Sequence, residues 1–261
     1  MIILVANIKG GMARTTVSVM LARAFSQTSK RVTLVDATAS GDSVRYVQRM
    51  QEKHNLVMPF EVDEFLNNPF MEGYDPSEGS AELRAHIQSL RESMNDGIVV
   101  VDTNSHHEDT LRALDPIADH VVVPYDYSPA SFEPTLRTLA SFGAPTTVLP
   151  HQRFSTIDAE DEERLGQVAK KASQLSGSIL RLKQAYAKCT IPDSTSEFDQ
   201  LASEIFNKNS LTLKEEQLNE VVVPLNTRIS YKHKKLLNDV SRNTGKTIRS
   251  LIEEAIDAAY L

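Results

Sequence analysis

The first two thirds of the chain alternate short apolar runs with longer amphipathic stretches, and this alternation is the feature that most restricts the fold. Five runs are rich in β-branched residues and almost uninterrupted by polar ones: residues 2–6, 32–35, 98–101, 121–123 and 147–149. Strands that are buried on both faces have this composition. Helical patterns lie between the runs, for example at residues 16–26 and 81–94. We therefore predict a doubly wound α/β domain with a mostly parallel sheet.

Length and composition limit what else the chain can contain. Its 261 residues are enough for one α/β domain and a small appendage. Hydrophobic residues make up 41% of the chain, a share that supports a packed core. Cys189 is the only cysteine, so no intrachain disulfide can form and a reducing, cytosolic compartment is expected. Neither end approaches the roughly 18 apolar residues of a membrane span, so no membrane partner is expected.

The charge of the chain is unevenly distributed. The net charge of −7 argues at first against nucleic acid as a partner. Residues 221–261, however, carry seven Lys/Arg and four Asp/Glu, which gives +3, whereas the other 220 residues carry 21 and 31, which gives −10. An acidic body with a basic tail is expected if only the tail meets a polyanion such as DNA.

The apolar pattern thins out before this tail and sets the expected domain boundaries. We predict a nucleotide-binding domain at residues 1–207, a linker at 208–220 and a small second domain at 221–261. Residues 67–80 are rich in turn formers and are expected to form a long surface excursion. The charged run at residues 158–164 is expected to be a solvated helix face.

A glycine-containing turn follows the first predicted strand and leads directly into a helix. It reads KGGMARTT, from Lys9 through Gly10, Gly11, Met12, Ala13, Arg14 and Thr15 to Thr16. Such a turn directs backbone N–H groups and a helix N-terminus at one point, which favours a phosphate group. The hydroxyl of Thr15 is placed to bind Mg²⁺. The general pattern G-x-x-x-x-G-K-[ST] is not met, because Ile8 and Ala13 hold the glycine positions and Arg14 holds the lysine position.

Two other predicted strands end in an aspartate. Residues 32–35 lead to Asp36, and residues 98–101 lead to Asp102. Ligands of open α/β sheets bind at the carboxyl ends of the strands, where carboxylates can hold Mg²⁺ or orient an attacking water. Either aspartate alone could be a helix cap or a loop carboxylate. Agreement among three strand ends favours a nucleotide site.

The segments KGGMARTT, VDATASGDS, VVVDTNS and ADHVVVP resemble, in order and spacing, the motifs of the ParA/MinD family of deviant Walker ATPases. IPDSTSEF resembles the family's late Ile-Pro segment near the base, so the similarity covers roughly residues 1–205. The resemblance implies a P-loop domain that forms a homodimer with ATP between its subunits and releases its partners on hydrolysis.

The resemblance also implies roles for individual residues. Lys9 matches the lysine that reaches the phosphates of the opposite subunit, and Gly10 to Thr16 match the loop that holds ATP. Thr15 and Asp102 match the Mg²⁺ ligands. Asp36 matches the carboxylate that positions water, and Pro192 matches the backbone that cradles adenine.

Three departures from the family pattern concern turnover. Arg14 replaces the loop lysine, and its guanidinium is larger and forked. Ala13 replaces a glycine whose missing Cβ lets the backbone approach the phosphates. Asn104 and Ser105 stand where proline is usual. Binding without hydrolysis, slow or DNA-stimulated hydrolysis, and loss of both are all compatible with these changes.

The tail has the pattern of one strand and two helices. Its first part alternates, with Val223, Leu225, Thr227 and Ile229 on one face. Ser230 is placed to cap the first helix and Gly245 to end it. The second helix carries apolar residues at i, i+3, i+4 and i+7 spacing from Ile248. About 40 residues bury little core alone, so two copies are expected to pair their strands.

The tail, with VPLNTRIS and TGKTIRSLIEEAI in register, resembles the ribbon-helix-helix DNA-binding family over its whole length. The resemblance implies that Asn226 and Arg228 read bases and that Lys246 and Thr247 anchor a phosphate. A dimerisation appendage without DNA binding is the alternative.

The two resemblances lead to two functional hypotheses. The first is an ATP-binding, ParA-like protein of plasmid partition, which binds a specific DNA site through its tail and autoregulates transcription, with or without an adaptor protein. The alternative is a transcriptional repressor whose P-loop domain no longer hydrolyses ATP.

Overall fold

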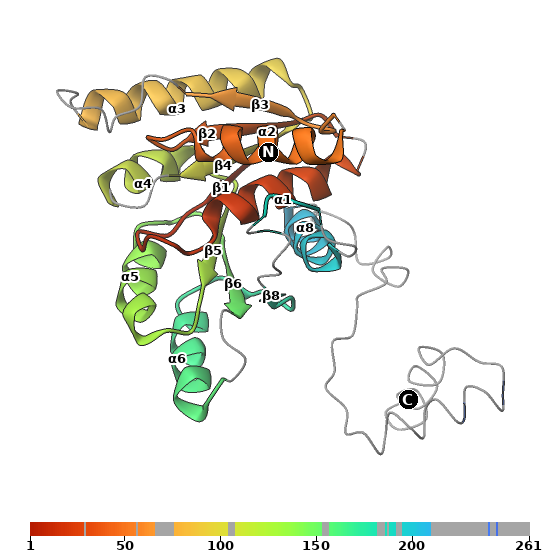
Figure 1. The fold of residues 1–261 in the computed structure, drawn as a ribbon. Coiled ribbons are helices and arrows are strands. Elements are labelled where there is room, and N and C mark those ends of the chain that lie inside the picture. Colours follow the sequence, from red (N-terminus) through yellow and green to blue (C-terminus); the bar gives the residue numbers. More distant parts are fainter. Residues whose placement is uncertain are drawn as a thin grey trace. The chain divides into compact units, whose positions relative to one another are not determined.

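A computed structural model gives the structure of the chain (Figure 1). It describes residues 1–28, 30–55, 57–65, 76–103, 108–152, 157–181, 186, 188–191, 195–209, 240 and 244. The chain divides into two units, Met1–Asn219 and Glu220–Leu261, and nearly all described residues belong to the first. The expected linker boundaries and the ribbon-helix-helix tail stay predictions, because their residues lie almost entirely outside this description.

The first unit alternates strands with helices. The strands are β1 (Ile2–Val5), β2 (Val32–Ala37), β3 (Glu61–Glu64), β4 (Ile98–Thr103), β5 (His120–Tyr125), β6 (Thr146–Gln152), β7 (Gln174–Leu175) and β8 (Leu180–Arg181). The helices are α1 (Arg14–Ser26), α2 (Asp42–His54), α3 (Pro76–Ser93), α4 (Glu108–Leu114), the 3₁₀ turn η1 (Asp115–Ile117), α5 (Pro129–Ala140), α6 (Ala159–Ala169) and α8 (Ser196–Asn209).

All strand pairs of the described sheet are parallel. The order is β3-β2-β4-β1-β5-β6-β7, and β8 also pairs with β6. The apolar strands β1, β2, β4 and β5 lie at its centre, where both faces are covered. The parallel, doubly wound sheet predicted from the five apolar runs is therefore confirmed.

Alternate residues of the central strands enter two different cores. Ile3 and Val5 of β1 pack with side chains from α1, α2 and α8, whereas Ile2 and Leu4 pack with side chains from α3, α4, α5 and α6. Burying each such side chain contributes about 1.5–3 kcal/mol. Helix α1 follows β1 on one face and α4 follows β4 on the other (Figure 1), so a crevice between their starting points is expected at the carboxyl ends of these strands.

Some predicted local features differ from the structure. The expected excursion at residues 67–80 is wrong for residues 76–80, which form the first turn of α3 with a proline at its start. The short strands β3, β7 and β8 were not expected, because they carry no continuous apolar run. Residues 67–75 lie outside the described residues.

Candidate nucleotide-binding site

The loop from β1 to α1 has a backbone shape that glycine normally provides. Gly11 and Ala13 have positive φ angles of 75° and 58°. An alanine in this left-handed conformation costs about 1–2 kcal/mol. The Ala13 carbonyl accepts the Val17 N–H at 2.9 Å, so α1 begins directly after the strained residue. Ala13 thus takes a left-handed conformation that glycine adopts more easily.

Side chains from the neighbouring strand and helix anchor this loop. The buried Asn7 side chain donates to the Pro124 carbonyl at 2.9 Å and to the Thr135 hydroxyl at 3.0 Å, and it accepts the Lys9 N–H at 2.9 Å. The Ile8 N–H donates to the Thr138 hydroxyl at 3.0 Å. The sequence interpretation missed Asn7, although a polar residue at the end of an apolar run was a usable signal.

Arg14 folds back onto the loop. Its Nη1 donates to the Asn7 carbonyl and, at 3.1 Å, to the Lys9 carbonyl. Burial lowers the pKa of the guanidinium, and the negative charges of Asp102 and Asp42 partly counteract this. Its Nε is buried and has no hydrogen-bond acceptor among the described residues. Arg14 therefore holds the loop and keeps one donor unsatisfied.

Asp36 lies at the end of β2 and accepts three hydrogen bonds. Its Oδ1 accepts the N–H and hydroxyl of Thr38 at 3.0 and 2.6 Å, and its Oδ2 accepts the Val44 N–H at 3.0 Å. Asp36 is 1% exposed. In this arrangement the carboxylate shapes the turn before α2, which is the helix-cap alternative considered from the sequence.

Asp102 lies beside Asp36, at the paired position of β4, and is completely buried. Its Oδ2 accepts the Ser43 hydroxyl at 2.7 Å. Burial raises its pKa to about 6, although the hydroxyls of Ser43 and Thr15 and the guanidinium of Arg14 favour the ionised form. The sheet thus brings Thr15 and both aspartates to one place.

These oxygen donors fit a magnesium ion. The Oδ1 atom of Asp102 is buried, and among the described residues no donor forms a hydrogen bond of normal geometry with it. The hydroxyl of Thr15 lies next to this carboxylate. Mg²⁺ prefers one or two protein carboxylates or hydroxyls together with phosphate oxygens and water. Asp102 and Thr15 can supply the protein ligands, and the loop amides can hold the phosphates.

The side chains of two other predicted residues, Met12 and Thr16, are engaged within the protein. Met12 is 1% exposed, because its side chain belongs to the core. The Thr16 hydroxyl forms a hydrogen bond with Tyr46, which favours the ionised form of the tyrosine. Only the main chain of these two residues is therefore available to a phosphate.

An open hollow of 580 Å³ lies beside the loop. It is lined by Ile8, Lys9, Gly10, Glu108, Asp109, Pro134 and Arg137. Glu108 forms ion pairs with Arg137 of α5 and with Arg112 of its own helix. Lys9 thus lies at an open edge of the site, with charges of both signs around it.

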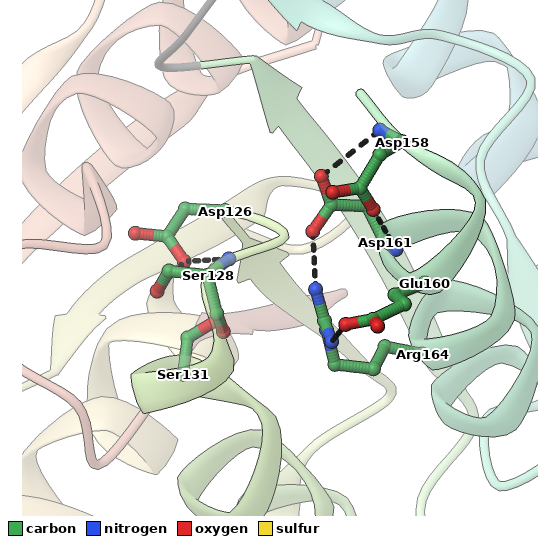
Figure 2. Close-up of polar contacts among 7 residues, drawn as sticks. All are labelled: Asp126, Ser128, Ser131, Asp158, Glu160, Asp161 and Arg164. Atoms are coloured by element: carbon green, nitrogen blue, oxygen red, sulfur yellow. Dashed lines mark hydrogen bonds and ion pairs between the residues drawn. The ribbon is translucent and has the colours of Figure 1, made fainter. Parts of the chain in front are cut away.

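A further aspartate, Asp126, follows β5 on the other side of β1. Figure 2 shows it with Ser128 and Ser131. Its Oδ1 accepts the N–H and hydroxyl of Ser128 at 3.0 and 2.7 Å, the same turn that Asp36 makes with Thr38. Burial opposes ionisation, but the two serine hydroxyls and the nearby His151 outweigh it and hold the pKa of Asp126 below its usual value. The sequence interpretation missed it, although an aspartate after an apolar run was the signal used for Asp36.

The charged residues at the start of α6 stabilise that helix. Asp158 and Asp161 form a reciprocal capping box, and Arg164 bonds Asp161 at 2.5 Å and Glu160 at 3.4 Å (Figure 2). The expected charged helix face is confirmed. Pro192, Asn226, Arg228, Lys246 and Thr247 lie outside the described residues.

The parallel sheet, the loop at the N-terminus of α1 and the aspartates at neighbouring strand ends define a P-loop nucleotide-binding domain. Residues 3–257 match the family described as CbiA: CobQ/CobB/MinD/ParA nucleotide binding domain, and the chain belongs to this family. A comparison with curated protein sequences finds no match. Within the described residues, no helix is long and apolar enough to cross a membrane.

Three solved structures illustrate the similarity of fold. An ATP complex of a McdA variant from Cyanothece is 16% identical, with a TM-score of 0.60 over 85% of this chain and 98% of that one. A putative plasmid partition protein from Borrelia burgdorferi bound to AMPPNP is 18% identical, with a TM-score of 0.58 over 80% and 98%. The pNOB8 ParA protein bound to nonspecific DNA is 13% identical, with a TM-score of 0.51 over 80% and 99%.

Proposed function

We propose that this chain is a ParA-like DNA segregation protein of plasmid partition, which binds ATP and Mg²⁺ in its P-loop domain and a specific DNA site through residues 221–261. The observation that carries the nucleotide part is the convergence of the loop, Thr15, Asp36 and Asp102 at one edge of the sheet. Solved relatives that hold ATP, AMPPNP or DNA support the same assignment.

In this proposal, different residues hold different parts of the nucleotide and its Mg²⁺ ion. The amides of residues 10–16 and the N-terminus of α1 bind the phosphates. Thr15 and Asp102 hold Mg²⁺, which, when bound, neutralises phosphate charge. Asp36 keeps the turn before α2 in place and orients water if the site turns over. Lys9, at the open hollow, reaches the phosphates of a second subunit, and Pro192 contacts adenine.

The tail supplies the DNA part of the proposal. Its charge of +3 suits a polyanion, whereas the body of the chain carries −10. Asn226 and Arg228 read base edges from a strand shared by two copies, and Lys246 and Thr247 anchor a phosphate. A tail that binds its own site replaces a separate adaptor protein or adds autoregulation of transcription. The protein then acts in the cytosol, associated with DNA.

A second candidate function is a transcriptional repressor that senses nucleotide without hydrolysing it. The three hydrogen bonds of Asp36 favour it, because they occupy three of the roughly four acceptor sites of this carboxylate and leave it little capacity to orient water. Arg14, which holds the loop carbonyls, is a second departure from a hydrolysing site.

ATP binding and phosphate release, measured with Mg²⁺ and with or without DNA, separate the two candidates. DNA-stimulated turnover supports segregation, and binding without turnover supports the repressor. Failure to bind ATP would exclude both nucleotide roles. For the tail, Arg228→Ala is expected to remove sequence preference more than general DNA affinity. An equal loss on all sequences would contradict base reading by Arg228.

A further inference from the structure

A small apolar hollow lies where helix α5 packs beside helix α6 (Figure 1). Its volume is 340 Å³, and its described lining consists of Leu136, Arg137, Leu139 and Ala140 from α5 and Lys171, which follows α6. Leu139 is 4% exposed and belongs to the core, whereas Ala140 is exposed. The hollow, which we call the α5–α6 hollow, therefore has an apolar floor that side chains of a partner can enter.

The charged residues at the α5–α6 hollow are all positive. Arg137 and Lys171 line it, and among the described residues no acidic side chain does. Lys171 and its neighbour Lys170 are exposed, and neither forms an ion pair within the described part of the chain. Residues 1–220, by contrast, carry a net charge of −10. A local reversal of charge of this kind complements an acidic partner.

Arg137 also has hydrogen-bond donors to offer such a partner. It lines the second hollow, beside Lys9 and Gly10, where it forms an ion pair with Glu108. The Arg137 side chain is 65% exposed, and one carboxylate takes at most two of the five N–H groups of a guanidinium. The remaining N–H groups are therefore available to a second carboxylate that arrives in the α5–α6 hollow.

We propose that the α5–α6 hollow docks an acidic amphipathic segment of a partner protein, with an apolar side chain against Leu136 and Leu139 and carboxylates paired with Arg137 and Lys171. An amphipathic helix that lays its apolar face into a groove is a common mode of recognition, and charge pairs at the rim fix its register. A nucleic-acid backbone would meet the cations but leave the apolar floor uncovered. The inference goes beyond the proposed function, because neither ATP nor specific DNA takes part in this contact.

The test measures binding of a labelled synthetic helix of about 15 residues, built from leucine and glutamate, to the full-length chain by fluorescence anisotropy. A second peptide with lysine in place of glutamate measures the contribution of charge. Lys171→Glu reverses one lining charge, and Ala140→Glu adds a carboxylate to the lining. Lys170→Glu is the matched control, because it makes the same change of charge at a neighbouring exposed residue that does not line the hollow.

We expect the unsubstituted chain to bind the glutamate peptide more tightly than the lysine peptide. Lys171→Glu and Ala140→Glu should each weaken binding of the glutamate peptide about tenfold. Both residues are exposed, so the unfolding temperatures should stay nearly unchanged. Lys170→Glu should weaken binding by less than about threefold, and added salt should weaken it in every variant that still binds.

Three results would overturn the inference. No binding of the glutamate peptide, or equal losses in Lys171→Glu and Lys170→Glu, would show that the hollow is not a docking site for an acidic segment. Displacement of the peptide by duplex DNA would assign the cations to nucleic acid. Self-association that Lys171→Glu abolishes, seen by sedimentation, would assign the surface to a second copy of the chain. The assay contains no nucleotide, so its outcome is separate from failure of the proposed ATP binding.

Discussion

Asp36 and Asp102 are paired residues of the adjacent parallel strands β2 and β4, and the charge of Asp36 adds to the burial that raises the pKa of Asp102 to about 6. The two carboxylates differ in the hydrogen bonds that they accept. Asp36 accepts three hydrogen bonds from its own turn, whereas Asp102 accepts a hydrogen bond from the Ser43 hydroxyl of α2. One carboxylate therefore shapes the backbone, and the other is the better ligand for a cation.

Asp102→Asn should stabilise the metal-free protein at neutral pH. Because the folded-state pKa is raised above the unfolded value near 3.8, the carboxyl's stabilising contribution is complete below about pH 4 and is lost as the pH rises to about 6. The variant avoids this loss and should be more stable at pH 7 by about 3 kcal/mol. Urea unfolding in EDTA from pH 4 to 7 measures the free energy of unfolding of the variant and of the unsubstituted chain. A difference between them that does not change with pH would contradict the burial argument.

Asp36→Ala should destabilise the fold and should also lower any ATP turnover. The change leaves the N–H groups of Thr38 and Val44 without their acceptor, which costs about 1–3 kcal/mol. Asp36→Asn keeps an acceptor and should cost less. Urea unfolding and phosphate release are measured on both variants. A stable Asp36→Asn protein with normal turnover would mean that another group positions the water.

Ala13→Gly should be tolerated and should stabilise the loop. Ala13 has a φ of 58°, and glycine adopts this conformation without the Cβ clash of about 1–2 kcal/mol. Because glycine loses more backbone entropy on folding, the net gain is up to about 1 kcal/mol. Ala22→Gly, in the interior of α1, is the control and should destabilise by a similar amount. The unfolding temperatures of both variants test these two expected changes in stability. A loss of stability in Ala13→Gly would show that the left-handed alanine is not strained.

Asp126→Asn should destabilise the protein in a pH-dependent way. The pKa of Asp126 is held below its usual value, so its ionised form stabilises the fold above about pH 4, and this contribution is lost as the pH falls through the lowered pKa. The difference in unfolding free energy between variant and unsubstituted chain should shrink in acid. Exposed Glu92→Gln in α3 provides the comparison. A difference that persists at the lowest pH would point to lost hydrogen bonds instead of charge.

The local sequence predicted the central strands correctly because burial on both faces requires continuous apolar runs. The alternation in β1 is not visible in the sequence, yet Ile3 and Val5 enter one core and Ile2 and Leu4 the other. The edge strand β3 was missed because it is half exposed and carries three acidic residues, Glu61, Asp63 and Glu64. The start of α3 was missed because Pro76 resembles a turn signal and also suits the first turn of a helix.

By itself, the sequence determined the class of fold and the chemistry available at one edge of the sheet, since strand and helix periodicity and the types of residue at strand ends are local properties. Tertiary structure decided what each of these residues does. Arg14 turned toward the carbonyls of its own loop, and Asp36 became the acceptor of its own turn, whereas Asp102 was buried beside it. These differences arise because hydrogen-bond partners and burial depend on packing between distant segments, which the order of residues along the chain does not specify.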